Sequence, residues 1–378
     1  MRFSYWEQRS FLTNIDVLII GGGIVGLSAA ISAKRKDATL RVALVERDVF
    51  SAGASTKNAG FACFGSPSEI LDDLTRIPEE EVFETIEKRI RGLENLRTMV
   101  GEEELGFENT GGFELFREGD EQLFEQCEAK LEYLNKRMFP FTGTQKVYRK
   151  IDVNSQNWRF RGVRHAIAND LEGLIDTGEM ISRLWDLASD SGVRILHGLN
   201  IDALESTTDG VICFTEGAAF KIGKVIVCTN GLAAQILPHL PVVPARNQVL
   251  VTSEISGLSF NGAFHLDRGY VYFRHIGNRV LIGGFRNLDK QNEETWEFGL
   301  TPIIQEKLEE TLREVVLPEN DFTIDYRWSG IMGLGASKKP IVEEISPNLY
   351  AAVRMGGMGV AIGSLIGKEV VDLAIGNL

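Results

Sequence analysis

The chain has 378 residues, 44% of them hydrophobic and 25% charged, a composition typical of a globular protein. Its length is too great for one ordinary core, so we expect two domains that share one cleft. Lys and Arg number 40 and Asp and Glu number 53, so the formal net charge is −13. Because an acidic chain without a basic run repels polyanions, we expect no binding to nucleic acid or to an anionic membrane.

The four cysteines form neither a CxxC pair nor a metal-ligand spacing with the five histidines, so we expect reduced thiols and no metal site. The longest uncharged run, residues 17–33, is shorter than the roughly 20 residues of a membrane span. It carries several glycines, and no small-residue cleavage pattern follows it. These features predict a cytoplasmic protein without a membrane span.

The N-terminal part predicts a βαβ unit. Residues 15–20 are a continuous apolar run, typical of a parallel strand that is buried on both faces. A glycine-rich turn, Gly21 to Gly26, leads into helical spacing over residues 27–35, and residues 40–46 predict a second strand. This order of strand, turn, helix and strand indicates the opening unit of a nucleotide-binding fold.

The rest of the chain predicts two α/β regions that are interleaved in sequence, without an internal repeat. The expected helices cover residues 79–101, 121–136, 179–191, 301–315 and 360–375. The expected strands cover residues 111–117, 193–196, 224–231, 247–254, 270–274 and 279–285. The last three of these are typical of neighbouring strands in an antiparallel sheet.

The turn after the first strand has the spacing of a dinucleotide fingerprint. Gly21 permits the tight turn, Gly23 lets the backbone approach a pyrophosphate, and Gly26 lets the helix pack against the strand. The helix N-terminus offers free N–H groups and a positive dipole end to the phosphates. Glu46 ends the second strand, where a carboxylate binds ribose hydroxyls. Together these features predict a bound dinucleotide.

Two further segments favour FAD over NAD. Residues 53–61 form a small, polar, glycine-rich loop where a nicotinamide enzyme would continue with another helix and strand. Gly356 to Gly359 precede the apolar helix 360–375, whose N-terminal dipole favours negative charge on a reduced flavin. Glycine-rich sites near opposite ends of the chain suit a long cofactor that spans the fold.

These motifs together resemble the D-amino acid oxidase superfamily of FAD-dependent oxidoreductases, which includes glycine, sarcosine and γ-glutamylputrescine oxidases. The resemblance covers nearly the whole chain, and its motifs lie at residues 21–26, 46–47, 53–60, 172–177, 225–231, 244–252, 272–284, 328–330 and 357–360. It implies an α/β fold in which a Rossmann-like FAD-binding domain is interleaved with a substrate domain built on a large mixed or antiparallel sheet. The implied FAD-binding domain comprises residues 1–80, 150–235 and 325–378, and the implied substrate domain comprises residues 81–149 and 236–324.

The resemblance also implies which residues hold FAD. No histidine stands at Ala54 or Ser55, where some relatives carry covalent flavin, so we expect non-covalent FAD. Ile201 is expected to meet the adenine through its backbone. The expected cofactor-binding residues are Gly21, Gly23, Ile24, Val25, Gly26, Glu46, Arg47, Ser55, Thr56, Lys57, Asn58, Ala59, Gly60, Ile201, Thr229, Asn230, Gly231, Gly330, Gly356, Gly357, Met358, Gly359 and Val360.

The implied activity is oxidation of a C–N bond in a small amine or amino acid. A hydride passes from the carbon that bears the nitrogen to flavin N5, and the imine then hydrolyses. Because the flavin carries this chemistry, no side chain is identified as catalytic. The electron acceptor, oxygen or another molecule, stays open. The alternatives are a dehydrogenase of the same fold with another acceptor, a non-catalytic flavin-binding protein, and a nicotinamide-dependent dehydrogenase.

Several basic residues of these relatives are replaced. Met332 stands where glycine and D-amino acid oxidases have an arginine that pairs with the substrate carboxylate. Leu281 and Ala361 stand where sarcosine oxidases have lysines that activate oxygen and bind a carboxylate. Arg354 stands where the relatives have glycine. These differences argue against a simple α-amino-acid oxidase, and Leu281 slightly favours a dehydrogenase.

Other side chains are candidates for binding the substrate. Strand alternation puts Tyr270, Tyr272 and Arg274 on one face, where phenols and a guanidinium suit a carboxylate. Arg286 follows a glycine pair in the presumed substrate sheet, and we expect it ahead of Arg274 as the carboxylate partner. Arg354 is the third candidate, because a charge that replaces glycine beside a flavin needs a reason.

Overall fold

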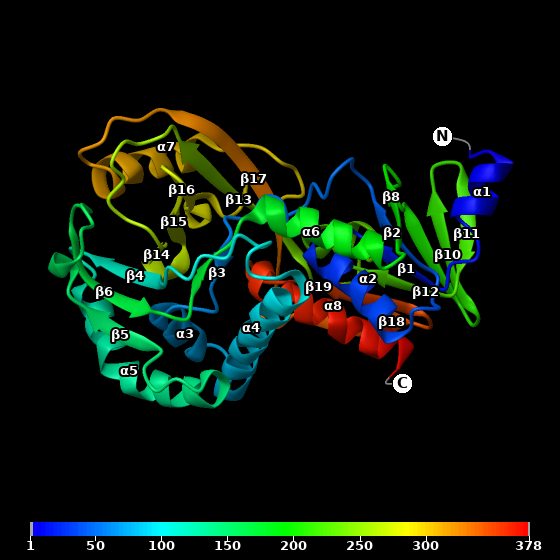
Figure 1. Cartoon of the computed structure of the whole chain (residues 1–378), viewed down its shortest axis with the longest axis horizontal. Coiled ribbons are helices and arrows are strands. Elements are labelled where there is room, and N and C mark those ends of the chain that lie inside the picture. Colours follow the sequence, from blue (N-terminus) through cyan, green and yellow to red (C-terminus); the bar gives the residue numbers. More distant parts are fainter. Residues whose placement is uncertain (1–2, 377–378) are drawn as a thin grey trace.

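The computed structural model describes residues 3–376, which form one part around a six-stranded sheet and another around an eight-stranded sheet (Figure 1). The six-stranded sheet has the order β18-β19-β12-β1-β2-β8. Its strands are β1 (Val17–Ile20), β2 (Val42–Glu46), β8 (Arg194–His197), β12 (Lys224–Val227), β18 (Ile341–Ser346) and β19 (Leu349–Val353). Neighbours pair in parallel except β18 and β19. β1 and β2 are buried along their whole length, as their apolar runs predict.

Helices cover one face of this sheet, and a three-stranded sheet covers the other. The helices are α2 (Ile24–Lys36), α6 (Thr177–Asp190) and α8 (Gly359–Ile375), and the small sheet consists of β9 (Ala203–Thr207), β10 (Gly210–Thr215) and β11 (Ala218–Ile222). Val17 and Ile19 of β1 pack in the core with α2 and α8, whereas Leu18 and Ile20 pack in the core with β10 and β11. The short helix α1 (Tyr5–Phe11) lies at the outer end of this part (Figure 1).

The eight-stranded sheet has the order β17-β13-β16-β15-β14-β4-β6-β5. Its strands are β4 (Gly112–Arg117), β5 (Tyr148–Ile151), β6 (Val163–Asn169), β13 (Val243–Thr252), β14 (Ala263–Leu266), β15 (Val271–Ile276), β16 (Arg279–Gly284) and β17 (Ile324–Leu334). The sheet is mixed, because β14 and β4 pair in parallel and the other neighbours are antiparallel. A large mixed or antiparallel sheet beside a Rossmann-like sheet is the predicted fold class, which is confirmed.

The remaining elements connect and cover these sheets. The longer helices are α3 (Pro67–Leu74), α4 (Glu79–Val100), α5 (Glu121–Thr142) and α7 (Pro302–Thr311). The shorter elements are η1 (Val153–Ser155), η2 (Asn230–Gln235), η3 (Asp267–Gly269), η4 (Arg286–Asp289), the π-helix Leu312–Val316, and the paired strands β3 (Phe61–Ala62) and β7 (Gly173–Leu174).

Two strands belong to a different sheet from the one that the expected domain bounds imply. β6 lies within residues 150–235 and β17 almost wholly within residues 325–378, both of which were expected in the FAD-binding domain. Both strands instead belong to the eight-stranded sheet, where β6 pairs with β4 and β17 pairs with β13. The choice of strand partner depends on long-range register, which a local apolar pattern does not carry.

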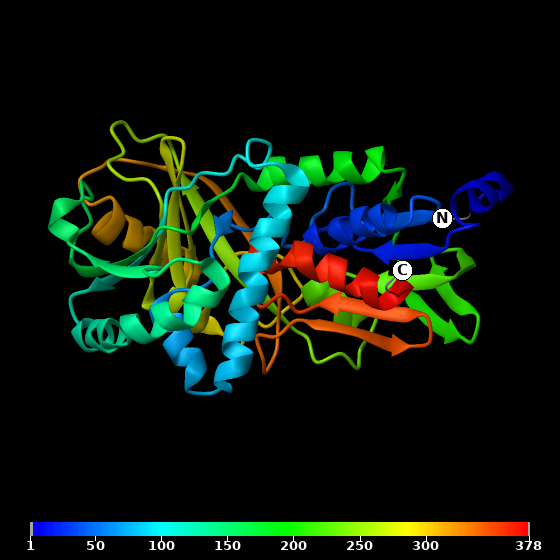
Figure 2. The same cartoon turned by 60° about the horizontal axis from the view of Figure 1, so that its bottom comes forward.

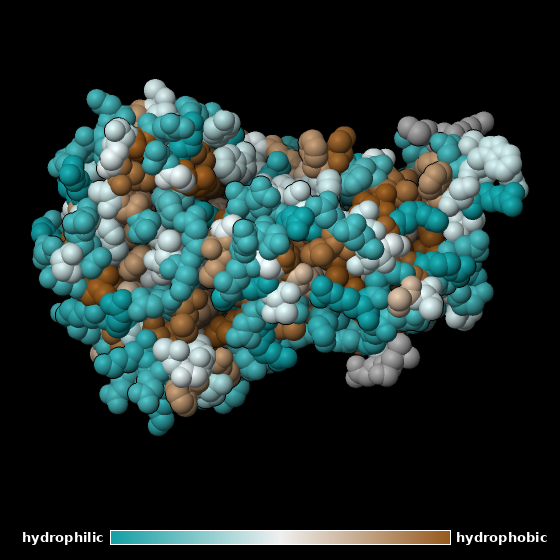
Figure 3. All heavy atoms as spheres, in the orientation of Figure 1, coloured by the Kyte–Doolittle hydropathy of each residue, from teal (hydrophilic) through white to brown (hydrophobic). Residues whose placement is uncertain are grey.

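The face of the molecule that Figure 3 shows is mainly polar. Figure 3 shows hydrophilic side chains over most of one face, with hydrophobic side chains in separate areas between them. Most of the large apolar side chains lie in the internal clusters instead. None of the described helices is long and apolar enough to cross a membrane.

α8 packs on α2 through residues that have no side chain. A Cβ atom at Gly367 would lie 2.6 Å from the carbonyl oxygen of Val25. A Cβ atom at Gly363 would lie 2.9 Å from Ile24 Cγ2. Real side chains do not tolerate such distances, so the close approach of these two helices requires glycine at both positions.

α4 crosses one end of α8 in the same manner (Figure 2). A Cβ atom at Gly92 would lie 2.1 Å from the carbonyl oxygen of Ala361. The Ser364 hydroxyl donates a hydrogen bond to the Gly92 carbonyl oxygen at 2.6 Å. α8 is therefore clamped between α2 and α4.

We predict that Gly92→Ala lowers the free energy of unfolding by about 1–3 kcal/mol, the usual cost of overpacking a close contact. Glu94→Ala, on the exposed side of the same helix, is the matched control and should stay within about 0.5 kcal/mol of the wild type. Urea unfolding of both variants measures the difference. Equal stability of Gly92→Ala and the wild type would contradict the tight crossing.

Candidate functional site

The glycine-rich turn joins β1 to α2 at the wall of a large cavity. Gly21 has a φ angle of +107°, and its N–H donates to the Val45 carbonyl oxygen at 2.9 Å, which ties the turn to β2. A Cβ atom at Gly26 would lie 1.9 Å from the Gly21 carbonyl oxygen, so only glycine lets α2 pack this close to the turn. Gly23 and Ile24 line the cavity, and the N-terminal end of α2 therefore faces it.

Glu46 ends β2 beneath this turn. Its buried carboxylate accepts hydrogen bonds from the Gly22 N–H at 2.9 Å and from the Asp48 N–H at 3.2 Å. Glu46 also lines the cavity, as does Ile201 from the segment after β8. Because a carboxylate has about four acceptor positions, these two bonds leave it able to accept from ribose hydroxyls.

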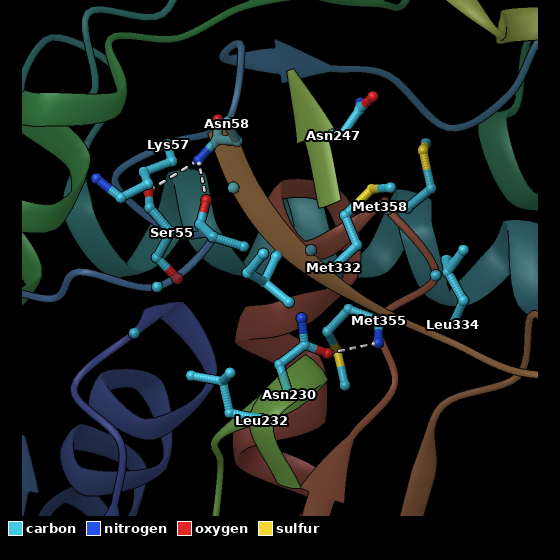
Figure 4. A pocket seen from close by; sticks show the side chains of 18 of the residues that line it. Ser55, Lys57, Asn58, Asn230, Leu232, Asn247, Met332, Leu334, Met355 and Met358 are labelled. Carbon is cyan, nitrogen blue, oxygen red and sulfur yellow. Dashed lines mark hydrogen bonds between the residues drawn. The ribbon is translucent and has the colours of Figure 1, made fainter. Parts of the chain in front are cut away.

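The loop after β2 forms the neighbouring wall. Ser55 Oγ accepts from the Ile24 N–H at 2.9 Å, and Asn58 Nδ2 donates to the Ser55 carbonyl oxygen at 2.8 Å (Figure 4). Asn58 Oδ1 accepts from the Gly60 N–H at 2.8 Å and from the Thr177 hydroxyl at 3.0 Å. These bonds hold the loop against the start of α2 and the start of α6.

The C-terminal glycine cluster forms a third wall. Gly356 and Gly357 have φ angles of +61° and +84°, and the chain then enters α8 at Gly359. Asn230 Oδ1 accepts from the Met355 N–H at 3.1 Å, which ties this turn to the segment after β12 (Figure 4). The positive dipole end of α8 thus lies at the same cavity as that of α2.

These walls surround one cavity of about 830 Å³, within the range of small-molecule sites. The cavity extends from Glu46 and Ile201 in one part of the molecule to Tyr272 and Arg286 in the other. Two helix N-termini and a carboxylate at a strand end all face it. This arrangement fits a dinucleotide that has its phosphates near the N-terminus of α2 and a ribose near the carboxylate.

Most of the residues expected to hold FAD line this cavity. They are Gly21, Gly23, Ile24, Val25, Glu46, Arg47, Ser55, Lys57, Asn58, Ala59, Ile201, Thr229, Asn230, Gly330, Gly356, Gly357, Met358, Gly359 and Val360.

Four residues that were expected to contact the cofactor do not line the cavity and contact protein instead. Gly26 packs against the turn, and a Cβ atom at Gly231 would lie 2.4 Å from the backbone of β17. Thr56 donates its hydroxyl hydrogen to the Ser51 carbonyl oxygen within the loop. Gly60 has a φ angle of +72°, and a Cβ atom there would lie 2.4 Å from the Ile175 carbonyl oxygen. A sequence motif does not distinguish a residue that contacts the ligand from one that packs against other protein residues.

Three of the expected substrate residues line the far end of the cavity, namely Tyr270, Tyr272 and Arg286. Tyr272 lies on β15, Tyr270 directly precedes this strand, and Arg286 begins η4 after β16. Arg286 Nη1 is shielded from solvent and has no hydrogen-bond partner among the described residues. An unpaired, shielded N–H is costly, so an anionic ligand group would stabilise it.

Arg274 does not line the cavity, which corrects the expectation that it binds the substrate. Its Nη1 donates to the carbonyl oxygens of Ala59, Gly60 and Ile175 at 3.2, 3.1 and 2.7 Å. Its Nε donates to the carbonyl oxygen of His275 at 2.9 Å. Burial lowers the pKa of Arg274 to about 10, so the guanidinium stays charged at neutral pH. Its donors serve to anchor the loop after β2.

Arg354 is also a structural residue, which corrects a second expectation. Its Nε and Nη2 donate to the Lys339 carbonyl oxygen at 3.0 and 2.9 Å, and its Nη1 donates to the Pro241 carbonyl oxygen at 3.3 Å. Its φ angle of +65° explains why a glycine suits this position. Arg354 does not line the cavity and holds the chain between β17 and β18.

Asn247 on β13 also lines the cavity and was missed from the sequence. Its Nδ2 donates to Tyr272 Oη at 2.8 Å. In the sequence, only the alternation of side chains along the strand after Pro244 points to Asn247. That alternation does not show which face of the strand lines the cavity until the strand partners are known.

An ion-pair cluster lies at another wall. Glu69 and Lys338 both line the cavity, and Lys338 Nζ lies 2.9 Å from Glu69 Oε1 and 2.7 Å from Asp73 Oδ2. Burial raises the pKa of Glu69, but Lys338 and Arg89 outweigh that effect, and the pKa of this carboxyl falls below its usual value. Glu69 is therefore a carboxylate whose charge is already balanced.

One group of side chains has the chemistry of metal ligands. Ligand atoms of Cys63, Glu172 and His265 lie within 4.8 Å of one another, a grouping that sequence spacing does not reveal. Glu172 Oε1, however, accepts from the N–H groups of Phe64 and Gly65 at 2.8 and 3.2 Å. Burial raises the pKa of Glu172 to about 7 and lowers that of His265 to about 4. Glu172 thus has a structural role in holding the chain after β3.

Comparison with known proteins identifies the family. The profile of the DAO family, described as FAD dependent oxidoreductase, matches residues 16–373. The chain therefore belongs to this family of FAD-dependent oxidoreductases.

Individual relatives are distant in sequence. The chain is 23% identical to a probable oxidoreductase OrdL of Rhizobium meliloti, over 96% of this chain and 83% of the relative. It is 24% identical to a gamma-glutamylputrescine oxidoreductase of Escherichia coli, over 96% and 84%. The crystal structure of glycine oxidase from Geobacillus kaustophilus superposes with a TM-score of 0.76 at 18% identity, over 96% of this chain and 95% of that chain. This structural likeness shows the shared fold.

We predict that Gly23→Val yields folded protein without FAD. A Cβ atom at Gly23 would already lie 2.6 Å from Ser55 Oγ, and the valine methyl groups would fill the space in which the turn meets phosphate. Flavin absorbance per mole of purified protein measures the loss, and circular dichroism checks the fold. A variant that retains flavin at the wild-type ratio would contradict the assigned phosphate site.

Proposed function

We propose that this chain oxidises a C–N bond in a small amine or amino acid. The observation that carries the proposal is a single cavity that joins the FAD-binding walls to an end lined by Tyr270, Tyr272 and Arg286. When bound, FAD supplies a two-electron acceptor whose N5 can take a hydride from the carbon that bears the nitrogen, and the imine then hydrolyses in water. The names of the relatives, a glycine oxidase and a gamma-glutamylputrescine oxidoreductase, also support it.

The residues of this chain have distinct roles in the proposal. Glu46 accepts hydrogen bonds from the ribose, and the backbone at Gly23 meets the pyrophosphate. The N-terminus of α8 after Gly357 favours negative charge on the flavin. Arg286 Nη1 donates to a carboxylate of the substrate, where the substrate has one.

A second candidate is a dehydrogenase that passes electrons to an acceptor other than oxygen. The observation that favours it concerns Leu281, which stands where related oxidases have a lysine that activates oxygen. Leu281 is 2% exposed and packs in an apolar cluster with Val249 and Trp328, so this position supplies no positive charge.

Anaerobic reduction of the flavin tests the proposed function. The holoprotein is mixed with a panel of amines and amino acids without oxygen, and loss of the yellow colour reports hydride transfer. Readmission of oxygen then separates the two candidates, because only an oxidase regains its colour rapidly. Flavin that is reduced by light but by no member of the panel would indicate a non-catalytic flavin-binding protein.

We predict that the FAD is bound without a covalent link. The loop residues Ala54 and Ser55 carry no imidazole that could bond to the flavin. Acid precipitation should therefore leave all of the flavin in the supernatant. Yellow colour that stays with the precipitated polypeptide would contradict this prediction.

We predict that Arg286→Met raises the concentration of a carboxylate substrate needed for half-maximal reduction by about a hundredfold or more. Removing one partner of a desolvated ion pair costs about 3–5 kcal/mol, and about 1.4 kcal/mol is tenfold. Arg159→Met, at an exposed arginine, is the control. Anaerobic reduction at varied substrate concentration measures both. Wild-type affinity in Arg286→Met would favour a substrate without a carboxylate.

A further inference from the structure

Asn247 and Tyr272 form a hydrogen-bonded pair on two strands that flank β16. Asn247 lies two residues before Val249 on β13, and both Val249 and Tyr272 are register partners of Gly283 on β16. A Cβ atom at Gly283 would lie 2.6 Å from Tyr272 Oη and 2.5 Å from Val249 Cγ1. The absence of a side chain at Gly283 therefore leaves room for the phenol. Figure 4 shows Asn247 on the side of the pocket that carries Met332, opposite the loop after β2.

The hydrogen bond within this pair fixes what it offers to a ligand. Asn247 Nδ2 donates to Tyr272 Oη at 2.8 Å, so the phenol hydrogen points elsewhere. No described residue accepts that hydrogen, and none donates to Asn247 Oδ1. The pair therefore presents one free donor, the phenol O–H, beside one free acceptor, the amide oxygen.

The surroundings of the pair are apolar. Tyr272 packs with Val249, Leu281 and Trp328, and the Phe61 ring meets its ring edge-on with centroids 5.4 Å apart. Burial raises the pKa of the Tyr272 phenol, which keeps its proton at any ordinary pH. An ammonium ion placed here would lose water and gain no counter-charge from the pair, which is costly.

We propose that Asn247 and Tyr272 bind the amino group of the substrate in its neutral form. The Tyr272 O–H donates to the nitrogen lone pair, and an N–H of the amine donates to Asn247 Oδ1. An ammonium has no lone pair to accept the first bond, so its proton passes to solvent before the amine binds, and no other bond changes. The inference rests on the proposed function and names the substrate group that this wall recognises.

Ligands that cannot be oxidised test the pair separately from turnover. tert-Butylamine, 2-aminoisobutyrate and pivalate lack a hydrogen on the carbon that would be oxidised. tert-Butylamine carries only the amino group, pivalate carries only the carboxylate, and 2-aminoisobutyrate carries both. Each is titrated into the FAD-loaded protein, and the shift of the flavin absorbance spectrum gives the dissociation constant.

The variants are Tyr272→Phe, which keeps the ring, and Asn247→Leu, which keeps the approximate size. Each should weaken tert-butylamine and 2-aminoisobutyrate about three- to tenfold, the range for one hydrogen bond, and leave pivalate unchanged. Arg286→Met is the matched control, which should weaken pivalate but not tert-butylamine. FAD content and thermal unfolding of every variant show that the site is intact.

A third variant tests the charge state of the amine. Asn247→Asp keeps an acceptor and adds a negative charge that an ammonium can pair with. The affinity of the wild type for tert-butylamine should rise with pH as the neutral fraction rises, whereas that of Asn247→Asp should depend less on pH. Wild-type affinity for tert-butylamine in both Tyr272→Phe and Asn247→Leu would overturn the proposal, as would failure of the wild type to bind this amine. The proposed function fails on a different result, which is the absence of flavin reduction by oxidisable amines.

Discussion

The clamping of α8 between α2 and α4 is the contact on which the site depends. Gly363 and Gly367 bring α8 onto α2, and Gly92 brings α4 onto the first turn of α8. The N-terminal ends of α2 and α8 both line the cavity, so the distance between these helices sets the distance between two positive dipole ends. Because glycine contacts leave no room for adjustment, the fold fixes the spacing of the two helix N-termini that line the cavity.

The arginines of the site show how burial decides between a structural and a binding role. A guanidinium has five N–H donors, and a buried one must satisfy them. Arg274 does so with carbonyl oxygens from the loop after β2, and Arg354 does so with the chain before β18. Arg286 differs, because its Nη1 is shielded and unpaired among the described residues. That difference in hydrogen bonding, and not charge alone, separates Arg286 from Arg274 and Arg354.

The sequence predicted well those features that depend on residues close together in the chain. The strand, turn and helix around Gly21 follow from neighbouring residues, because apolar periodicity and glycine spacing act within one segment. Sheet membership of β6 and β17 did not follow, since register with a distant strand decides it. The role of Arg274 was wrong for the same reason. Its carbonyl partner in Ile175 lies 99 positions away in the chain. Asn247 was missed because Tyr272 becomes its neighbour only through β16.

The charges around the cavity limit what can select a substrate. Glu69 is one of the carboxylates that line the cavity, but Lys338 already pairs with it and holds its pKa below the usual value. Adding a second cation there would compete with an existing ion pair, so this wall gains little from a charged amine. The proposed recognition of the nitrogen uses neutral hydrogen-bonding groups instead, which are direction-dependent and act at short range. In such a site, discrimination between amines depends on the geometry of Asn247 and Tyr272 more than on net charge.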